Sequence, residues 1–139
     1  MDYSGKSTTE EIRPRFDADA ERFSNLETGQ SAAMDSRLML DLAASVCGAM
    51  RPEAEALLDI GCGAGNYTLR LLDALPRLHS VTAVDLSQPM LDRARLRVLA
   101  ARAGIAWEEL RGDIRELDLG RGRFDFAVAA AVLHHLRGE

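Results

Sequence analysis

The stretch LLDIGCGAGNYTLRLL, residues 57–72, constrains the fold of this chain more than any other feature. A short, fully apolar strand runs into Gly61, Gly63 and Gly65 and then into an amphipathic helix. Glycines allow the main chain to turn sharply and a ligand to approach it closely. In the dinucleotide fingerprint G-x-G-x-x-G the third glycine comes three positions after the second, but here Gly65 comes two positions after Gly63, and Asn66 occupies the third position. The loop therefore predicts a nucleotide-type site that differs from the NAD pattern.

Apolar strands and helical segments alternate after this point. We predict strands at 56–60, 81–86, 105–110 and 124–131, with intervening helices at 67–75 and 87–103. Ser87 is the expected cap of the second of these helices, with Pro89 in its first turn and Gly104 as its stop. Buried strands separated by helices indicate a parallel α/β sheet.

Two further helices are predicted before the alternating part. The first spans residues 10–26, and the second is expected to begin near Ser31 or Asp35. The apolar stripe of the second helix consists of Leu38, Met39, Leu42, Val46 and Met50. We therefore divide the chain into a tail with capping helices, residues 1–52, and a Rossmann-like domain, residues 53–139.

The composition limits the class of protein. With 139 residues, 47% hydrophobic and 28% charged, the chain matches one soluble globular domain. No apolar run reaches the roughly 18 residues of a membrane-spanning helix, and the polar N-terminus lacks a secretory signal. The net charge of −5 offers no basic excess for nucleic acid. We expect a cytosolic protein without a membrane partner, and the charge does not support a nucleic-acid partner.

Cysteine and histidine residues predict no metal site. Cys47 and Cys62 lack any CxxC spacing, and Cys47 is expected in the core. His134 and His135 are adjacent, and neighbouring helical residues point about 100° apart, so they do not easily share one metal. Packing is the preferred interpretation of this pair, and a catalytic base is the alternative.

Two acids follow predicted strands at the edge where the glycine loop lies. Asp85 ends the second strand, where a carboxylate can accept hydrogen bonds from both hydroxyls of a ribose. Asp113 follows the third strand and can accept from an adenine amino group. Leu86 would pack either on the adenine face or in the core. The alternatives are a helix-capping or surface acid for Asp85 and a turn aspartate for Asp113.

Other residues invite simpler interpretations. The fourth strand ends in small residues, including Ala129 and Ala130, against which a ligand can lie. Arg93 and Arg97 are spaced i,i+4 on the helix at 87–103, and we expect them on its solvated face.

The series DIGCGAG, AVDLS, GDI and FDFAVAAAVLHHL, in this order and spacing over residues 57–136, resembles the class I S-adenosylmethionine-dependent methyltransferases. The resemblance implies that the loop from Asp59 to Gly65 holds the methionine part of the cofactor, with Cys62 a tolerated small residue. It also implies that Asp85 binds the ribose and that Leu86 flanks the adenine. Asp113 and the Ile114 amide would read the adenine edge, and the backbone at Ala129 and Ala130 would meet the methionine amino group.

The same resemblance implies a Rossmann-like three-layer sandwich with strand order 3-2-1-4. Members of the family have seven strands, so the chain is expected to be a truncated form with N-terminal helices. The unpaired outer edge of the fourth strand would then favour self-association. We name no catalytic residue, because methyl transfer from a sulfonium needs a base only when the nucleophile arrives protonated.

The predicted function is S-adenosylmethionine-dependent methyl transfer to a small molecule. A non-catalytic fragment that binds the cofactor or associates with another chain is the first alternative. An NAD-type oxidoreductase is the second, and the spacing of the glycine loop disfavours it.

Overall fold

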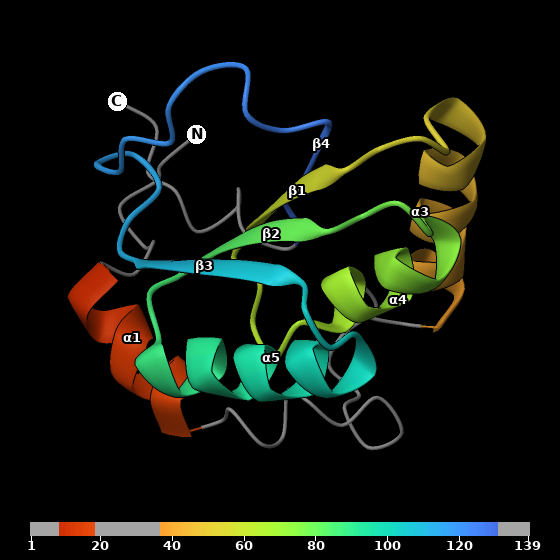
Figure 1. The fold of residues 1–139 in the computed structure, drawn as a ribbon. Helices are drawn as coiled ribbons and strands as arrows, with labels where there is room; N and C mark the ends of the chain where they lie inside the picture. The colour runs from red at the N-terminus through yellow and green to blue at the C-terminus, as the bar shows by residue number, and fades with distance from the viewer. Residues whose placement is uncertain (1–8, 19–36, 131–139) are drawn as a thin grey trace, which may run out of the picture.

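The sheet of the computed structural model has the predicted parallel order. The structure describes residues 9–18 and 37–130. Its four strands lie in the order β3-β2-β1-β4, and all three pairings are parallel (Figure 1). Their bounds are β1 Ala56–Ile60, β2 Ser80–Asp85, β3 Ala106–Arg111 and β4 Phe126–Val128. The order 3-2-1-4 with flanking helices confirms the predicted Rossmann-like α/β class.

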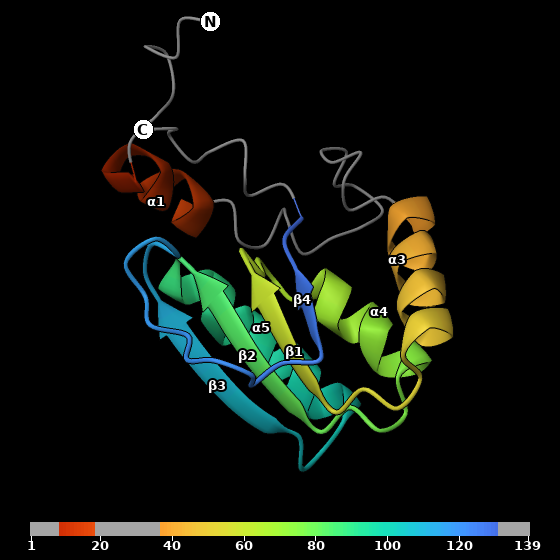
Figure 2. The ribbon, with the colours of Figure 1, turned by 90° about the horizontal axis from the view of Figure 1, so that it is seen from above.

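Helices α4 (Asn66–Ala74) and α5 (Gln88–Ala101) lie on one face of the sheet. In the view from above, the strands stand in front of them, and the chain between β3 and β4 crosses the opposite face (Figure 2). Helix α3 (Arg37–Met50) packs beside α4. The described residues thus supply the sheet and one helical layer of the predicted sandwich. The division of the chain at residue 52 stays a prediction.

The main core lies between the sheet and these two helices. Leu57 and Val81 from neighbouring strands meet Leu71 of α4, its C-cap Leu75 and Val98 of α5, and all five are fully buried. Ser87 caps α5 as predicted, because its hydroxyl accepts from the N–H of Met90. This packing fixes α4 and α5 against β1 and β2, and so it fixes the loops at the carboxyl ends of those strands.

Strand β4 is shorter than the prediction of 124–131. Its paired residues begin at Phe126, and the main-chain N–H of Asp125, just before it, donates to the carbonyl of Ala56. The Asp125 carboxylate accepts from the N–H groups of Glu55 and Ala56 at 2.8 and 3.0 Å. Ala131 lies outside the described residues.

The predicted apolar stripe of α3 does not face the protein. Its five members are between 38% and 75% exposed: Leu38, Met39, Leu42, Val46 and Met50. The helix instead packs through Leu40, Ala44 and Cys47, which are spaced by four and three residues. Small side chains on this line, together with Gly48 near Ala74, permit a closer approach to α4 than the large residues would.

Helix α1 (Thr9–Ala18) lies beyond the carboxyl ends of β2 and β3, next to α5 (Figures 1 and 2). Ile12 is its buried contact. The part of the predicted first helix after residue 18 and the expected caps Ser31 and Asp35 lie outside the described residues.

Candidate functional site

The carboxyl ends of the four strands bring the predicted site residues to one edge of the sheet. Asp59 pairs in register with Ala83 on one side and with Val128 on the other. Asp85, the last residue of β2, pairs with Arg111, the last residue of β3. Ligands of open parallel sheets bind at this edge. Every loop or side chain discussed next follows one of these strand ends.

The glycine loop turns as its sequence predicts. Gly61, Gly63 and Gly65 have φ angles of 67°, 51° and 83°, in the left-handed region that favours glycine. Gly65 is packed against α5, since a Cβ there would lie 3.2 Å from the Cβ of Ala94. Gly63 is different, because a Cβ built on it meets no heavy atom within 4 Å. Gly65 is therefore required by packing, whereas Gly63 adjoins open space.

Asp59 and Cys62 hold the loop from within. The Asp59 side chain is 2% exposed and accepts from the Thr68 hydroxyl at 2.6 Å, which joins the end of β1 to α4. Cys62 packs with Leu91 and Ala94 of α5. Burial raises the pKa of the Cys62 thiol well above its ordinary value, and the carboxylate of Asp59 raises it further. A neutral thiol is a poor nucleophile, which agrees with a purely spatial role for Cys62.

Asp85 is held by main-chain donors. Its carboxylate accepts from the N–H of Gly63 at 2.9 Å and from the N–H of Ser87 at 2.9 Å. Burial raises the pKa of Asp85, and these N–H groups oppose that rise. Each carboxylate oxygen has a second lone pair, so the group can still accept hydrogen bonds from a ligand. The bond to Gly63 places this acceptor next to the open space at the loop.

Asp113 has side-chain partners. Two guanidinium nitrogens of Arg115 donate to its carboxylate at 3.0 and 2.6 Å, and the Thr9 hydroxyl of α1 donates at 3.2 Å. The hydrogen bonds from Arg115 lower the pKa of Asp113 to about 2. Ile114 follows it and is half-buried. The N–H of Gly112 donates to the carbonyl of Asp85 and ties the two strand ends together at 3.0 Å.

The remaining predicted residues lie at the same edge. Leu86 is half-buried directly after Asp85. Ala129 and Ala130 directly follow Val128, the partner of Asp59. The structure therefore brings together all of the predicted cofactor residues: Asp59, Gly61, Cys62, Gly63, Gly65, Asp85, Leu86, Asp113, Ile114, Ala129 and Ala130. Their binding roles stay predictions, and His134 and His135 lie outside the described residues.

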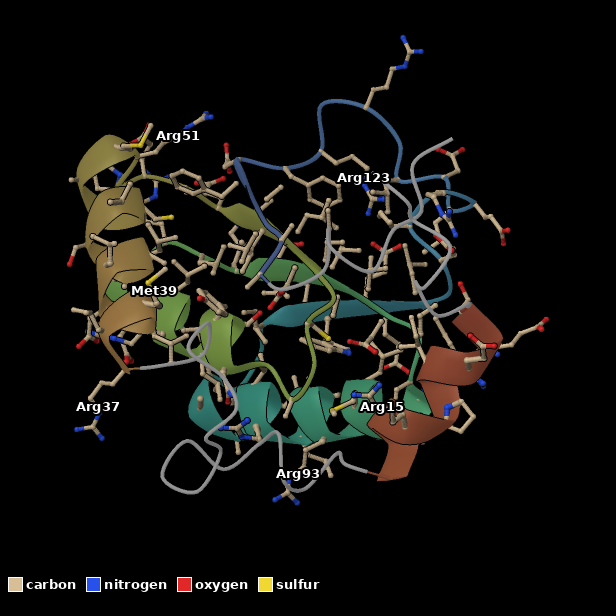
Figure 3. The ribbon with its side chains drawn as sticks, turned by 180° about the vertical axis from the view of Figure 1, so that it is seen from behind. Arg15, Arg37, Met39, Arg51, Arg93 and Arg123 are labelled. Atoms are coloured by element: carbon tan, nitrogen blue, oxygen red, sulfur yellow. The ribbon has the colours of Figure 1, made fainter. Side chains whose placement is uncertain are left out.

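Arg97 is a site residue that the sequence interpretation missed. Its guanidinium Nη1 donates to the carbonyl of Ala64 at 2.7 Å and to Oδ1 of Asn66 at 2.9 Å. The expected solvated position is therefore wrong for Arg97, which is half-buried, whereas Arg93 is exposed and points away from the protein (Figure 3). Burial lowers the pKa of Arg97. The i,i+4 spacing gave no signal that separated the two arginines.

Helix α1 adds two polar groups that were also missed. Within the described residues, Asp17 Oδ1 and Arg13 Nε are buried atoms without a hydrogen-bond partner. The charge of Asp17 also raises the pKa of Asp85, so the two carboxylates lie within electrostatic range. A buried acceptor without a donor is costly, and a ligand with hydroxyl or amino groups would satisfy it.

Residues 9–18 and 37–130 contain no group of three or more His, Cys, Asp or Glu side chains arranged to hold a metal ion. In the same part of the chain, no helix combines the length and the apolar character needed to cross a bilayer.

The sequence model of the family described as "Methyltransferase domain" matches residues 57–139. The chain belongs to this methyltransferase family. An uncharacterized methyltransferase of Mycobacterium tuberculosis is 42% identical over 82 residues, which are 59% of this chain and 38% of that protein. This methyltransferase domain chain therefore spans well under half the length of that curated relative.

Two solved structures share the fold. Magnesium protoporphyrin IX methyltransferase from Synechocystis PCC 6803, solved with bound S-adenosylhomocysteine, matches with a TM-score of 0.65 at 20% identity. That match covers 86% of this chain and 57% of the other. The [4+2]-cyclase SpnF matches with a TM-score of 0.68 at 18% identity, over 88% of this methyltransferase domain and 49% of the cyclase.

Proposed function

We propose that this chain binds S-adenosylmethionine at the glycine loop and Asp85, and that the protein transfers the methyl group to a small-molecule acceptor. The observation that carries the proposal is the Asp85 carboxylate, which the N–H groups of Gly63 and Ser87 hold beside open space at Gly63. An oriented carboxylate with spare lone pairs suits the two hydroxyls of a ribose. The family match supports the same cofactor.

The residues of this edge fit the rest of the cofactor. The loop from Asp59 to Gly65 would lie against the methionine part, and the backbone of Ala129 and Ala130 would meet its amino group. Leu86 would flank the adenine, and Asp113 with the Ile114 amide would accept and donate at the adenine edge. The buried, unpaired Asp17 Oδ1 supports a ligand that carries hydrogen-bond donors.

The bound cofactor would supply an electrophilic methyl group on a sulfonium, a good leaving group. This chain's own contribution would be to bind and to orient. Holding donor and acceptor in line converts an encounter between two molecules into a reaction within one complex, which accounts for a large part of such rate enhancements. The chemistry requires a base only for a protonated acceptor, and we assign no catalytic residue.

The proposal also covers the methyl acceptor, the cellular location and the self-association of the protein. The net charge of −5 gives no support for nucleic acid, which favours a small molecule. The polar composition favours the cytosol. Self-association would use the outer edge of β4, whose described pairing is with β1. A sedimentation coefficient that rises with protein concentration would support this part, and a constant monomer value would contradict it.

A cofactor-binding chain without its own transferase activity is the second candidate. The [4+2]-cyclase SpnF shares the fold and is named for a different activity, so the fold alone does not decide the reaction. Turnover of S-adenosylmethionine with a panel of acceptors separates the two candidates. An NAD-type enzyme is disfavoured, because Asn66 at the third-glycine position is buried and bonded to Arg97.

The test is thermal unfolding of this chain with S-adenosylhomocysteine and, separately, with NAD. A ligand at about 100 times its Kd that binds only the folded state adds roughly 2.7 kcal/mol of stability. We expect an upward shift of Tm with S-adenosylhomocysteine alone. A cooperative transition without that shift, or an equal shift with NAD, would overturn the cofactor assignment.

A further inference from the structure

We propose that Arg97 is a positioning residue that holds the glycine loop in the conformation that binds the cofactor. This inference rests on the proposed function and adds a residue to it. The side chain comes from the middle of α5 and reaches the loop that follows β1. It bonds two consecutive parts of the turn, the carbonyl of Ala64 and the side chain of Asn66.

The position of the two bonds decides what Arg97 controls. Ala64 lies between Gly63, which adjoins open space, and Gly65, which packs against Ala94. Asn66 begins α4. The guanidinium therefore connects α5 to the point where the turn becomes a helix. A cation that donates hydrogen bonds from a half-buried position holds its acceptors more strongly than a neutral donor.

Three main-chain hydrogen bonds also hold the loop: the N–H groups of Gly61 and Cys62 donate to the carbonyl of Val84, and that of Gly65 donates to the carbonyl of Cys62. None of these three bonds involves Ala64 or Asn66, the two residues that Arg97 contacts. Gly65 caps α4 in the left-handed conformation, and no side chain supplies the cap hydrogen bond. The Gly63 N–H is bonded to Asp85, so movement of the loop also moves the partner of the proposed ribose acceptor. Without Arg97, the Ala64 carbonyl would lose a 2.7 Å hydrogen bond and Asn66 Oδ1 would lose one of 2.9 Å. We expect the loop to sample conformations that bind the cofactor less well.

Arg102 provides a matched control on the same helix. It also donates from a half-buried guanidinium to main-chain carbonyls, those of Leu72, Leu75 and Leu78 at 2.6 to 3.3 Å. These acceptors lie at the far end of α4, away from the carboxyl edge of the sheet. Replacing Arg102 therefore removes the same kind of interaction from the same packing layer and leaves the glycine loop untouched.

The experiment compares Arg97→Met, Arg97→Lys and Arg102→Met. Affinity for S-adenosylhomocysteine is measured by calorimetry, and amide hydrogen exchange is measured without ligand. Loss of hydrogen bonds from a charged donor predicts about a tenfold weaker affinity for Arg97→Met. Arg97→Lys keeps a cation that donates hydrogen bonds, so we expect its affinity to lie within about threefold of the original. Arg102→Met is expected to bind as the original protein does, although its stability falls.

Hydrogen exchange tests the same inference without the cofactor. In Arg97→Met, the amides of Gly63 and Gly65 should exchange at least about tenfold faster, because the loop opens locally. In Arg102→Met, faster amide exchange is expected at residues 75–78 and not at the glycine loop. Equal loop exchange in both Met variants would overturn the inference.

The outcomes for the two proposals are distinguishable. If the original protein fails to bind S-adenosylhomocysteine, the proposed function fails, and hydrogen exchange still decides whether Arg97 holds the loop. If the original protein binds it and Arg97→Met binds equally well, only the role of Arg97 fails. If Arg97→Met does not fold, Arg97→Gln takes its place in the same two measurements, and loop exchange and affinity no different from those of Arg102→Met would overturn the inference.

Discussion

The carboxyl ends of β2 and β3 each present an aspartate, and the two are held in opposite ways. Asp85 accepts from the main chain at Gly63 and Ser87, and burial raises its pKa. Asp113 accepts from Arg115 and Thr9, and the guanidinium lowers its pKa to about 2. Main-chain donors leave the Asp85 carboxylate in one place whatever the neighbouring side chains do. Asp113 also accepts from one main-chain N–H, that of Arg115 at 3.0 Å, but its other three hydrogen bonds come from side chains that can be exchanged.

This difference affects how readily each carboxylate can bind a ligand at the carboxyl edge of the sheet. A carboxylate fixed by the backbone can bind ligand hydroxyls without first giving up a strong ionic partner. A carboxylate paired with Arg115 must share its lone pairs with that guanidinium. We therefore expect Asp85 to contribute more to cofactor affinity than Asp113.

The largest expected effect is that of Asp85→Asn. Hydrogen bonds to a charged group are worth about 1.5–3 kcal/mol each, so losing the charge toward two ribose hydroxyls should weaken S-adenosylhomocysteine binding by at least about thirtyfold. Calorimetry measures this. Asp73→Asn is the control, because the Asp73 side chain is 73% exposed on α4 and should leave the affinity unchanged. A loss below threefold for Asp85→Asn would remove the distinction between the two acids.

Asp113→Asn should have a smaller effect on the same affinity. The amide oxygen of Asn can still accept from an adenine amino group, so we expect a loss of roughly three- to tenfold, the range of a neutral hydrogen bond. Competition with adenosine in place of S-adenosylhomocysteine assigns this loss to the adenine part. A loss for Asp113→Asn that exceeds the loss for Asp85→Asn would reverse the comparison.

The two acids should also give opposite slopes of stability against pH. The folded pKa of Asp113, about 2, is below the value of about 3.9 for an unfolded chain, so its stabilisation is present above pH 4 and is lost as the pH falls toward 2. The folded pKa of Asp85 is raised, so its contribution is most favourable below the unfolded pKa and is lost as the pH rises through the folded pKa.

Urea unfolding of the original protein and of both Asn variants between pH 3 and pH 7 measures these slopes. On acidification, the original protein should lose stability relative to Asp113→Asn and gain it relative to Asp85→Asn. Slopes of the same sign for the two acids would show that burial does not raise the pKa of Asp85 in the folded protein.

The smallest effect is expected for Arg115→Met. The Arg115 side chain is about half exposed, and pairs of that kind contribute roughly 0–1 kcal/mol. The pKa of Asp113 should rise toward its ordinary range, as carbon-detected NMR titration would show, and ligand affinity should change by less than about threefold. If the pKa of Asp113 does not rise in Arg115→Met, then Thr9 and the main chain, not the guanidinium, hold Asp113.

Local patterns were sufficient to predict the sheet and the position of the site. The apolar run of β1 matches its predicted bounds at 56–60, and the left-handed glycines of the loop follow from their spacing. Asp85 and Asp113 were predicted at one edge because parallel strands present their carboxyl ends together. These features depend on the order of residues along single elements, which one sequence displays directly.

Features that depend on the rotation of one helix against another were not predicted. Arg93 and Arg97 differ by one helical turn, and only the placement of α5 makes Arg93 exposed and Arg97 half-buried and bonded to the glycine loop. In α3, the large apolar residues predicted the wrong face, because Leu40 and Ala44 lie on the side that packs. Hydrophobicity alone does not reveal which line of a helix permits the closest approach.

The buried thiol in the glycine loop makes the loop chemically observable. Cys62 is 8% exposed and burial raises the pKa of its thiol, so the thiol can ionise and react with an alkylating reagent only when the turn separates from α5. Cys47, half-buried on α3, gives an internal reference within the same molecule. The ratio of the Cys62 to the Cys47 labelling rate therefore reports how often the loop separates from α5, without any substitution. A ligand that stabilises the turn would slow the labelling of Cys62 and leave that of Cys47 unchanged.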